Sequence, residues 1–413
     1  KYGRVRDVIY EIDALTMQIR ESDLAAVQKL PFVAAANPDA ERNGGPFDTV
    51  PIEDFLVGIT TWDMDVINVM DGDRAVLESG EGVYVAVLDT GLVDVWRRLF
   101  PEERIATEYA MSFGGGGGEV GNVSSQPNKW EHDQSSHGTH VTSTILGYSY
   151  RGTPIGGVAP RAKVIPVKVL NQNGSGWSSV VARGITYVGD LKAGPLANAP
   201  VVINMSLGGP ELDIMEKAAL DYAISVGVIV VASAGNEGED GMGYPGAYAP
   251  VISVAASGWG GEWYPDENGI PIRSWWYALD VAENKGVAEY YITDFSSREL
   301  PDQELDVAAP GSWIVGPYKV NSGNNLSYYF LGGTSMASPH VAGIAALMLQ
   351  KNPTMGQAEV ESILKGTALP MAPGCLEVYQ PNGTVEEYCW AEDATGAGLA
   401  TADAALAGTP PAP

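Results

Sequence analysis

The chain has 413 residues, of which 45% are hydrophobic, and it carries 51 acidic and 24 basic residues for a net charge of −27. This balance excludes nucleic acid and anionic membrane surfaces as partners, because phosphate contacts need clustered Lys and Arg. No apolar run approaches the ~18 residues of a membrane-spanning helix. We therefore expect a globular protein with a sizeable core that acts as a monomer.

Residues 3–39 predict a small α+β unit. Extended patterns over residues 5–9 and 12–19 precede a short helix from Asp23 to Leu30, which Ser22 caps and Pro31 ends. The apolar residues 32–36 then predict a further strand. The polar stretch from residue 37 to 51 contains Gly and Pro and predicts an exposed linker open to proteolysis.

From about Trp62 the pattern changes to short apolar runs that alternate with helical stretches. This alternation predicts an α/β domain with a mostly parallel central sheet, helices on both faces, and a site at the carboxyl ends of the strands. The predicted strands are Val83–Leu88, Val164–Val169, Val201–Met205, Val228–Ala232 and Val251–Ala255. The predicted helices are His137–Leu146, Ser178–Val188, Ile214–Val226 and Ser338–Gln350.

Four polar residues stand where predicted strands end or helices begin. Asp89 ends an apolar strand and is followed by Thr-Gly, and Asn236 follows the strand that begins at Val228. His137 opens a helix, and Ser335 follows two glycines at the start of another, where free N–H groups favour a developing negative charge. Taken singly, each residue is more often a turn, cap or structural residue than a catalytic one.

His132, His137 and His140 could alternatively bind zinc. No Glu follows the histidines as a base, and the helix after His140 offers no further ligand, so the spacing disfavours this reading.

The three motifs together resemble the subtilase family of serine proteases. The resemblance rests on Asp89-Thr90-Gly91, His137-Gly138-Thr139-His140 and the segment from Gly332 to His340, in that order, and it covers the chain from about residue 62 to residue 408. It implies a subtilisin-like endopeptidase that works through an acyl-enzyme. Ser335 would be the nucleophile, His137 the base, Asp89 the residue that orients it, and Asn236 an oxyanion donor.

The resemblance also implies a substrate cleft in which an extended peptide pairs with two segments of the enzyme. The matching residues are Gly174, Ser175, Gly176, Ser206, Leu207, Gly208 and Gly243. The open pocket at Gly243 favours large apolar or aromatic residues before the cut, while Glu237 could also accept Lys. The Tyr244-Pro245 bond is expected to be cis.

Residues 1–42 resemble the later half of a subtilisin-type propeptide, up to its ending Ala36-Asn37-Pro38-Asp39. Residues 43–61 would then be a linker, residues 62–408 the peptidase domain, and residues 409–413 a tail. The resemblance implies a secreted zymogen whose partners are protein substrates and its own propeptide. Two alternatives are a self-inhibited complex, with the propeptide tail lying in the cleft, and a catalytically silent binding scaffold.

The chain departs from the family pattern in three places. No cofactor is needed for catalysis, but the usual structural calcium site is doubtful, because residues 147–154 offer few oxygen ligands and Arg98 stands where an Asp is expected. The acidic pairs Asp63/Asp65 and Asp71/Asp73 could supply a different site or be solvated surface residues. Insertions are expected at about 258–293, rich in aromatic residues, and at 370–393.

The second insertion contains the only two cysteines, Cys375 and Cys389. An isolated pair at this spacing suits one disulfide around a surface loop in an oxidising compartment. The alternative is two unpaired thiols.

Overall fold

The computed structural model describes residues 2–43, 48–51, 60–114, 127–277, 281, 289–320 and 326–413. Its main sheet has the strand order β16-β15-β14-β13-β7-β11-β8, with β17 also pairing with β15. All of these neighbours are parallel except β15 and β16. The strands are β7 (Tyr84–Asp89), β8 (Met111–Ser112), β11 (Lys163–Lys168), β13 (Val201–Met205), β14 (Val228–Ser233), β15 (Ile252–Trp259), β16 (Tyr290–Ile292) and β17 (Val307–Pro310).

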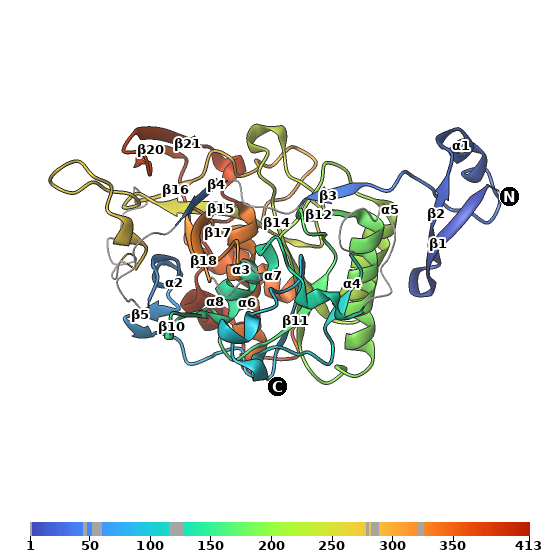
Figure 1. The fold of residues 1–413 in the computed structure, drawn as a ribbon, viewed down its shortest axis with the longest axis horizontal. Coiled ribbons are helices and arrows are strands. Elements are labelled where there is room, and N and C mark those ends of the chain that lie inside the picture. Colours follow the sequence, from blue (N-terminus) through green and yellow to red (C-terminus); the bar gives the residue numbers. More distant parts are fainter. Residues whose placement is uncertain are drawn as a thin grey trace.

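Helices cover both faces of this sheet (Figure 1). Alternate residues of one strand enter different cores: Val85 and Val87 pack in the core that contains α3 and α6, whereas Ala86 and Leu88 pack with α4 and α5. This two-sided burial explains why the strands are continuous apolar runs, and it confirms the predicted fold class. The long helices are α3 (His137–Leu146), α4 (Ser178–Ala193), α5 (Ile214–Ser225), α6 (Thr334–Lys351) and α7 (Gln357–Thr367).

The five predicted strands and four predicted helices of this domain are present, most of them within one or two residues of the expected bounds. One strand and two helices differ more: β15 continues four residues beyond the expected end at Ala255. α4 continues five residues beyond the expected end at Val188, and α6 starts four residues before the expected Ser338 and contains Pro339. A proline normally marks a helix start, which is why the sequence pattern places the boundary too late.

The N-terminal unit lies at one end of the molecule, beside α5 (Figure 1). β1 (Gly3–Ile9) and β2 (Ala14–Ile19) form an antiparallel pair, followed by the short helix α1 (Leu24–Val27). Ile9 is fully buried against the core of α4 and α5, and Arg183 of α4 pairs with Glu11 at 3.5 Å.

Two expectations for this unit are wrong. Residues 32–36 form no strand, because the unit's described sheet has two strands and offers them no partner. α1 is shorter than the expected Asp23–Leu30, and Ser22 lies in a 3-10 turn rather than capping it.

The described part of the predicted linker contributes two short strands. β3 (Glu41–Asn43) pairs antiparallel with β12 (Ser175–Trp177), and β4 (Asp48–Pro51) pairs with β19 (Tyr328–Gly332), which also pairs with β18 (Ile314–Pro317). Residues 44–47 and 52–59 of this linker lie outside the described residues.

The first predicted insertion packs against the domain through buried residues near its two ends, whereas most of residues 264–274 are exposed. Trp263 is fully buried, with ring centroids 5.7 Å from Trp275 and 4.7 Å from Phe330, and β16 extends the main sheet as an antiparallel strand on β15. Residues 278–280 and 282–288 of this insertion lie outside the described residues.

The second insertion forms the hairpin β20 (Gly374–Tyr379) and β21 (Val385–Trp390). Its two cysteines face each other across the hairpin and are joined by a disulfide, which confirms the predicted pairing.

The remaining elements are short. They are α2 (Trp62–Val66), α8 (Ala402–Gly408), and the hairpins β5 (Met70–Asp71) with β6 (Asp73–Arg74) and β9 (Tyr148–Tyr150) with β10 (Thr153–Ile155). Within the described residues, no helix has the length and apolar character to span a membrane.

Candidate active site

Asp89 and His137 form a buried pair at the carboxyl edge of the sheet. Asp89 is the last residue of β7, and His137 is the first residue of α3; both side chains are fully buried. His137 Nδ1 lies 2.8 and 2.9 Å from the two carboxylate oxygens of Asp89. Gly138 permits this approach, because a Cβ there would lie 2.5 Å from the Gly91 carbonyl oxygen.

The pair sets the titration of the imidazole. Burial by itself lowers the pKa of His137, but the charge and hydrogen bond of Asp89, together with the nearby Asp133, raise it above its ordinary value of 6.5. The Nε2 atom of His137 is buried and has no hydrogen-bond partner among the described residues. The ring therefore has one nitrogen fixed by a carboxylate and the other available.

Asp133 and Lys168 support this pair and were not predicted from the sequence. Asp133 accepts hydrogen bonds from the Ser136 N–H at 2.7 Å and the Thr139 hydroxyl at 2.8 Å, which fixes the start of α3. Ser136 has a left-handed backbone, with φ of 66°. Lys168 is buried and donates to the Thr90 carbonyl at 2.6 Å. The only sequence signal for Asp133 is that it lies four residues before His137, and an acid at such a spacing is too common to indicate a role.

Ser335 lies in the first turn of α6, as predicted. Its hydroxyl donates to the carbonyl of Ser206 at 3.2 Å, and its own carbonyl accepts from the Ser206 hydroxyl at 2.8 Å. Pro339 has no N–H to offer that carbonyl, so the Ser206 hydroxyl satisfies it instead.

Strand register places Ser335 beside the Asp89–His137 pair. Val87 of β7 is the direct neighbour of Asn204 in β13, so Asp89 and Ser206 follow two residues later on adjacent chains. Neighbouring strands are about 4.8 Å apart. Because Ser335 is hydrogen-bonded to Ser206, the three predicted triad residues gather at one edge of the sheet.

Asn236 follows β14 and is held by the residue before Ser335. The backbone N–H and the hydroxyl of Thr334 both donate to its Oδ1, at 2.9 and 3.0 Å. This contact assigns the amide oxygen and leaves Nδ2 as a donor without a partner among the described residues. The role of Thr334 was not predicted.

A small pocket joins Asn236 to Ser335 and to three of the seven predicted substrate residues, Leu207, Gly208 and Gly243. Its lining residues are Leu207, Gly208, Ser233, Gly235, Asn236, Glu237, Gly243, Thr334 and Ser335. Ser206 reaches Ser335 through the hydrogen bonds above. Gly174, Ser175 and Gly176 do not line this pocket: Ser175 and Gly176 lie in β12, which pairs with β3, and Gly174 directly precedes that strand. The Tyr244-Pro245 bond is cis, as expected.

The N-terminal segment is bound beside β12 and the starts of α4 and α5. Asp39 accepts from the Ser178 hydroxyl and the Ser179 N–H at the start of α4, both at 2.9 Å. The Asn37 amide donates to Asp213, which caps α5. The segment therefore satisfies groups at the first turns of two helices before it enters the pairing with β12.

The histidines do not form a zinc site. His137 is bound to Asp89, and His140 Nε2 donates to the carbonyl of Ile314 at 3.2 Å. Burial lowers the pKa of His140 to about 3. No group of metal-ligating side chains in the described part of the chain includes His132, His137 or His140.

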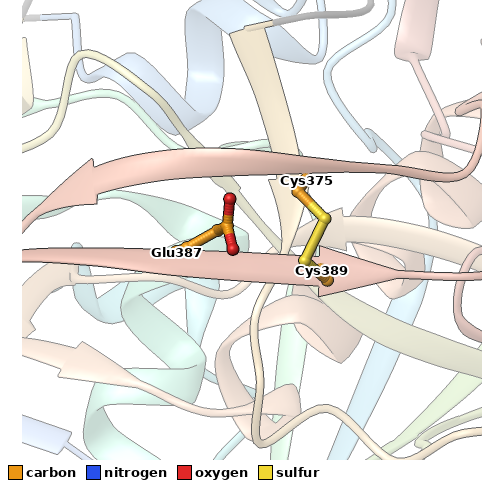
Figure 2. A group of neighbouring side chains, drawn as sticks. All are labelled: Cys375, Glu387 and Cys389. Carbon is orange, nitrogen blue, oxygen red and sulfur yellow. A yellow bond between two sulfur atoms is a disulfide. The ribbon is translucent and has the colours of Figure 1, made fainter.

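Two other groups bring potential ligands together, but neither suits a metal. In one, Cys375 and Cys389 are joined in the disulfide beside Glu387 (Figure 2). In the other, Glu304, Asp306 and Glu361 surround the Lys365 ammonium, which offsets part of their charge; its distance to Asp306 is 2.9 Å.

The residues considered for a calcium site offer few free oxygen ligands in the structure. Asp63 accepts from His340 at 3.0 Å and Asp65 from the Val281 N–H at 2.6 Å, so both carboxylates are already used. Asp71 and Asp73 face each other across the β5–β6 turn and belong to no ligand cluster among the described residues. Residues 148–155 form the β9–β10 hairpin rather than an oxygen-rich loop.

Residues 80–399 match the model of the Subtilase family of peptidases. The chain belongs to the subtilase family. It is 35% identical to Subtilisin DY of Bacillus licheniformis over 293 residues, which is 70% of this chain and 84% of the relative. It is 31% identical to a thermostable alkaline protease of Halalkalibacterium halodurans over 366 residues, 88% of this chain and 80% of the relative.

Solved structures agree with the subtilase assignment. Sphericase superposes with a TM-score of 0.58 at 27% identity and covers 83% of this chain and 97% of its own. A psychrophilic protease, S41, gives a TM-score of 0.56 at 28% identity, with 83% and 98% covered. The chain is therefore a subtilisin-like serine peptidase with a mostly parallel central sheet.

Proposed function

We propose that this subtilase is an endopeptidase in which Asp89, His137 and Ser335 form the catalytic triad. The observation that carries the proposal is the buried Asp89–His137 pair beside a serine in the first turn of a helix. Ser335 Oγ attacks the scissile carbonyl while His137 Nε2 takes its proton and later returns it to the leaving amine. Asp89 holds the imidazole and stabilises its charged form. For this, the Ser335 hydroxyl turns from the Ser206 carbonyl towards His137.

Asn236 and the N–H of Ser335 stabilise the oxyanion of the tetrahedral intermediate. Thr334 holds the Asn236 oxygen, so the amide donor is preoriented and needs no reorganisation during the reaction. The start of α6 adds its free N–H groups and dipole.

The residue before the cut enters the pocket between Leu207–Gly208 and Gly235–Glu237. The wall includes Leu207, and three glycines, Gly208, Gly235 and Gly243, place no side chain in the space, which supports a preference for large apolar or aromatic residues. Glu237 at the pocket, held by the Ser297 hydroxyl at 3.0 Å, also permits Lys.

The chain as given is the self-inhibited form of a secreted zymogen. Its residues 1–42 act as the propeptide, and three contacts support this assignment: the β3–β12 pairing, the Asp39 contacts at α4, and the buried Ile9. The Cys375–Cys389 disulfide supports an oxidising, extracellular location. The silent-scaffold alternative is disfavoured because all four catalytic positions carry the required side chains.

The test is covalent labelling of Ser335 by a fluorophosphonate, followed by intact-mass analysis and peptide mapping. We expect a single adduct on Ser335 that is absent from Ser335→Ala. Labelling should be slow in the intact chain and fast once residues before Asp48 have been cleaved off. Protein that stays unlabelled after that cleavage would contradict the catalytic assignment.

A further inference from the structure

Arg42 occupies a position that an extended substrate would fill. It is the central residue of β3 and lies opposite Gly176 in the antiparallel pairing with β12. On its other side is Gly209, where an added Cβ would lie 2.6 Å from Arg42 Nη1 and 2.8 Å from the Glu41 carbonyl oxygen. The segment at Arg42 therefore lies between β12, which pairs with its backbone, and Gly209, which contacts the Arg42 side chain and the Glu41 carbonyl.

The side chain of Arg42 is buried in an acidic pocket beside this groove. Its Nε and Nη2 atoms donate to Glu216 Oε2 at 3.1 and 2.8 Å, and both side chains are completely shielded from solvent. Nη2 also donates to the Glu211 carbonyl at 2.5 Å, and Nη1 to the Glu41 carbonyl at 3.2 Å. Four donor contacts in a fixed arrangement fit the planar guanidinium fork.

Among the described residues, Arg42 is the only cation that pairs with Glu216. Its second oxygen, Oε1, is buried without a hydrogen-bond partner among the described residues. Burial raises the pKa of Glu216 to about 7; Arg42 opposes this shift, and Asp213 and Asp39 add to it. A buried carboxylate that loses its only cation is strongly destabilised, so the pocket favours a guanidinium over neutral side chains.

The register locates this pocket relative to the site of cleavage. Ser206, whose carbonyl accepts the Ser335 hydroxyl, and Gly209, which contacts Arg42, are three residues apart in sequence. Paired extended chains advance together residue by residue. Arg42 therefore stands roughly three residues upstream of the residue whose carbonyl meets Ser335.

We propose that Glu216 is a specificity-determining residue that selects Arg about four residues before the cut in protein substrates. In the intact chain Arg42 of the N-terminal segment occupies the same pocket. This inference rests on the proposed peptidase function and adds a second requirement, a cationic one, to the apolar residue expected next to the cut.

The experiment compares quenched fluorescent peptides that differ only at this position, which carries Arg, its uncharged isostere citrulline, or norleucine. Full-length protein is assayed after self-processing, with open sites counted by fluorophosphonate titration and the cut verified by mass spectrometry. The variants are Glu216→Gln, Glu216→Leu, and Asp221→Asn, which removes an exposed carboxylate from the same helix.

We expect Arg to exceed citrulline by about 10- to 100-fold in kcat/KM, the effect of a charge-assisted, buried set of hydrogen bonds. The ratio should stay unchanged in Asp221→Asn and fall to about threefold or less in Glu216→Gln. Glu216→Leu should prefer norleucine. The wild-type ratio of Arg to citrulline needs no variant, so the test survives misfolding of either substitution.

Two results would overturn the inference, and they differ from each other. If the norleucine peptide is cleaved as fast as the Arg peptide, the peptidase stands and Glu216 only anchors the N-terminal segment. If no peptide is cleaved and no fluorophosphonate adduct forms, the peptidase function fails and this specificity fails with it.

Discussion

Thr334 and Ser335 are neighbours in the sequence but serve different parts of the site. Thr334 fixes the oxygen of Asn236, and in the proposed mechanism Ser335 carries the nucleophilic hydroxyl. A single helix start therefore positions both the attacking atom and the donor that receives the developing charge. Because the donor works mainly in the transition state, its removal should affect turnover more than binding.

Replacing Asn236 by Leu, which has a similar volume and no donor, should lower kcat by ~10²–10³ and leave KM nearly unchanged. The magnitude is taken from subtilisin, the standard example of this effect and a member of the same family. Steady-state kinetics on one peptide measures both constants. The control variant Thr334→Val keeps the backbone N–H and should lose much less activity. A rise in KM for Asn236→Leu as large as the fall in kcat would show that Asn236 also binds the ground state.

The pH dependence of kcat/KM should reflect the raised pKa of His137. In the proposed mechanism the neutral imidazole is the base, so activity should be lost as the pH falls through this pKa. Because Asp89 raises the pKa above 6.5 despite burial, the midpoint of the acid limb should lie above pH 6.5. The rate of fluorophosphonate labelling should follow the same limb. A midpoint at or below 6.5 would mean that burial outweighs the Asp89 charge.

At the scale of elements, the strands and helices of the peptidase domain could be predicted because each strand is buried on both faces and is therefore a continuous apolar run. The start of α6 could not, since Ser206 compensates for Pro339 through a contact between distant segments. The absence of a strand at residues 32–36 likewise depends on a missing partner, which no local pattern reveals.

The candidate site shows the same division. The motifs around Asp89, His137 and Ser335 could be recognised because their order and flanks are specific. Asp133 and Glu216 could not, because their importance comes from burial and from partners far away in the sequence. An acid in a sequence is usually solvated, and only the fold distinguishes the exceptions.

The β20–β21 hairpin is the element that the disulfide should stabilise. Cys375 and Cys389 close a loop with a sequence separation of 14. A disulfide that closes a loop of this size lowers the entropy of the unfolded chain and so stabilises the fold by about 3 kcal/mol. Reduction should therefore lower the midpoint of thermal unfolding by several degrees in a reductant titration. The double variant Cys375→Ser/Cys389→Ser should start at the lower midpoint and be insensitive to reductant. An unchanged midpoint would mean that the hairpin opens independently of the domain.

At the scale of the whole molecule, the N-terminal segment is held by several different contacts rather than by one large interface. Ile9 is buried against α4 and α5, Arg183 pairs with Glu11, Asp39 binds the start of α4, and Arg42 is buried with Glu216. These contacts bring the end of β3 to the groove and the start of β4 to Gly332, three residues before Ser335.

Because both flanks of residues 44–47 are tied to the site, the chain should cut itself between Asn43 and Asp48. Wild-type protein incubated above the midpoint of the acid limb should lose its N-terminal segment, which intact mass and N-terminal sequencing would reveal. Ser335→Ala should remain at 43.6 kDa.

Mixing Ser335→Ala with a trace of wild type separates two routes to this product. Cleavage within one molecule leaves the variant intact at early times and is independent of protein concentration, as the docked β3 predicts. Cleavage between molecules would process the variant at a rate that rises with the wild-type concentration. A cut elsewhere in the chain would contradict the register, because the pairings of β3 with β12 and β4 with β19 would then not describe the segment that meets Ser335.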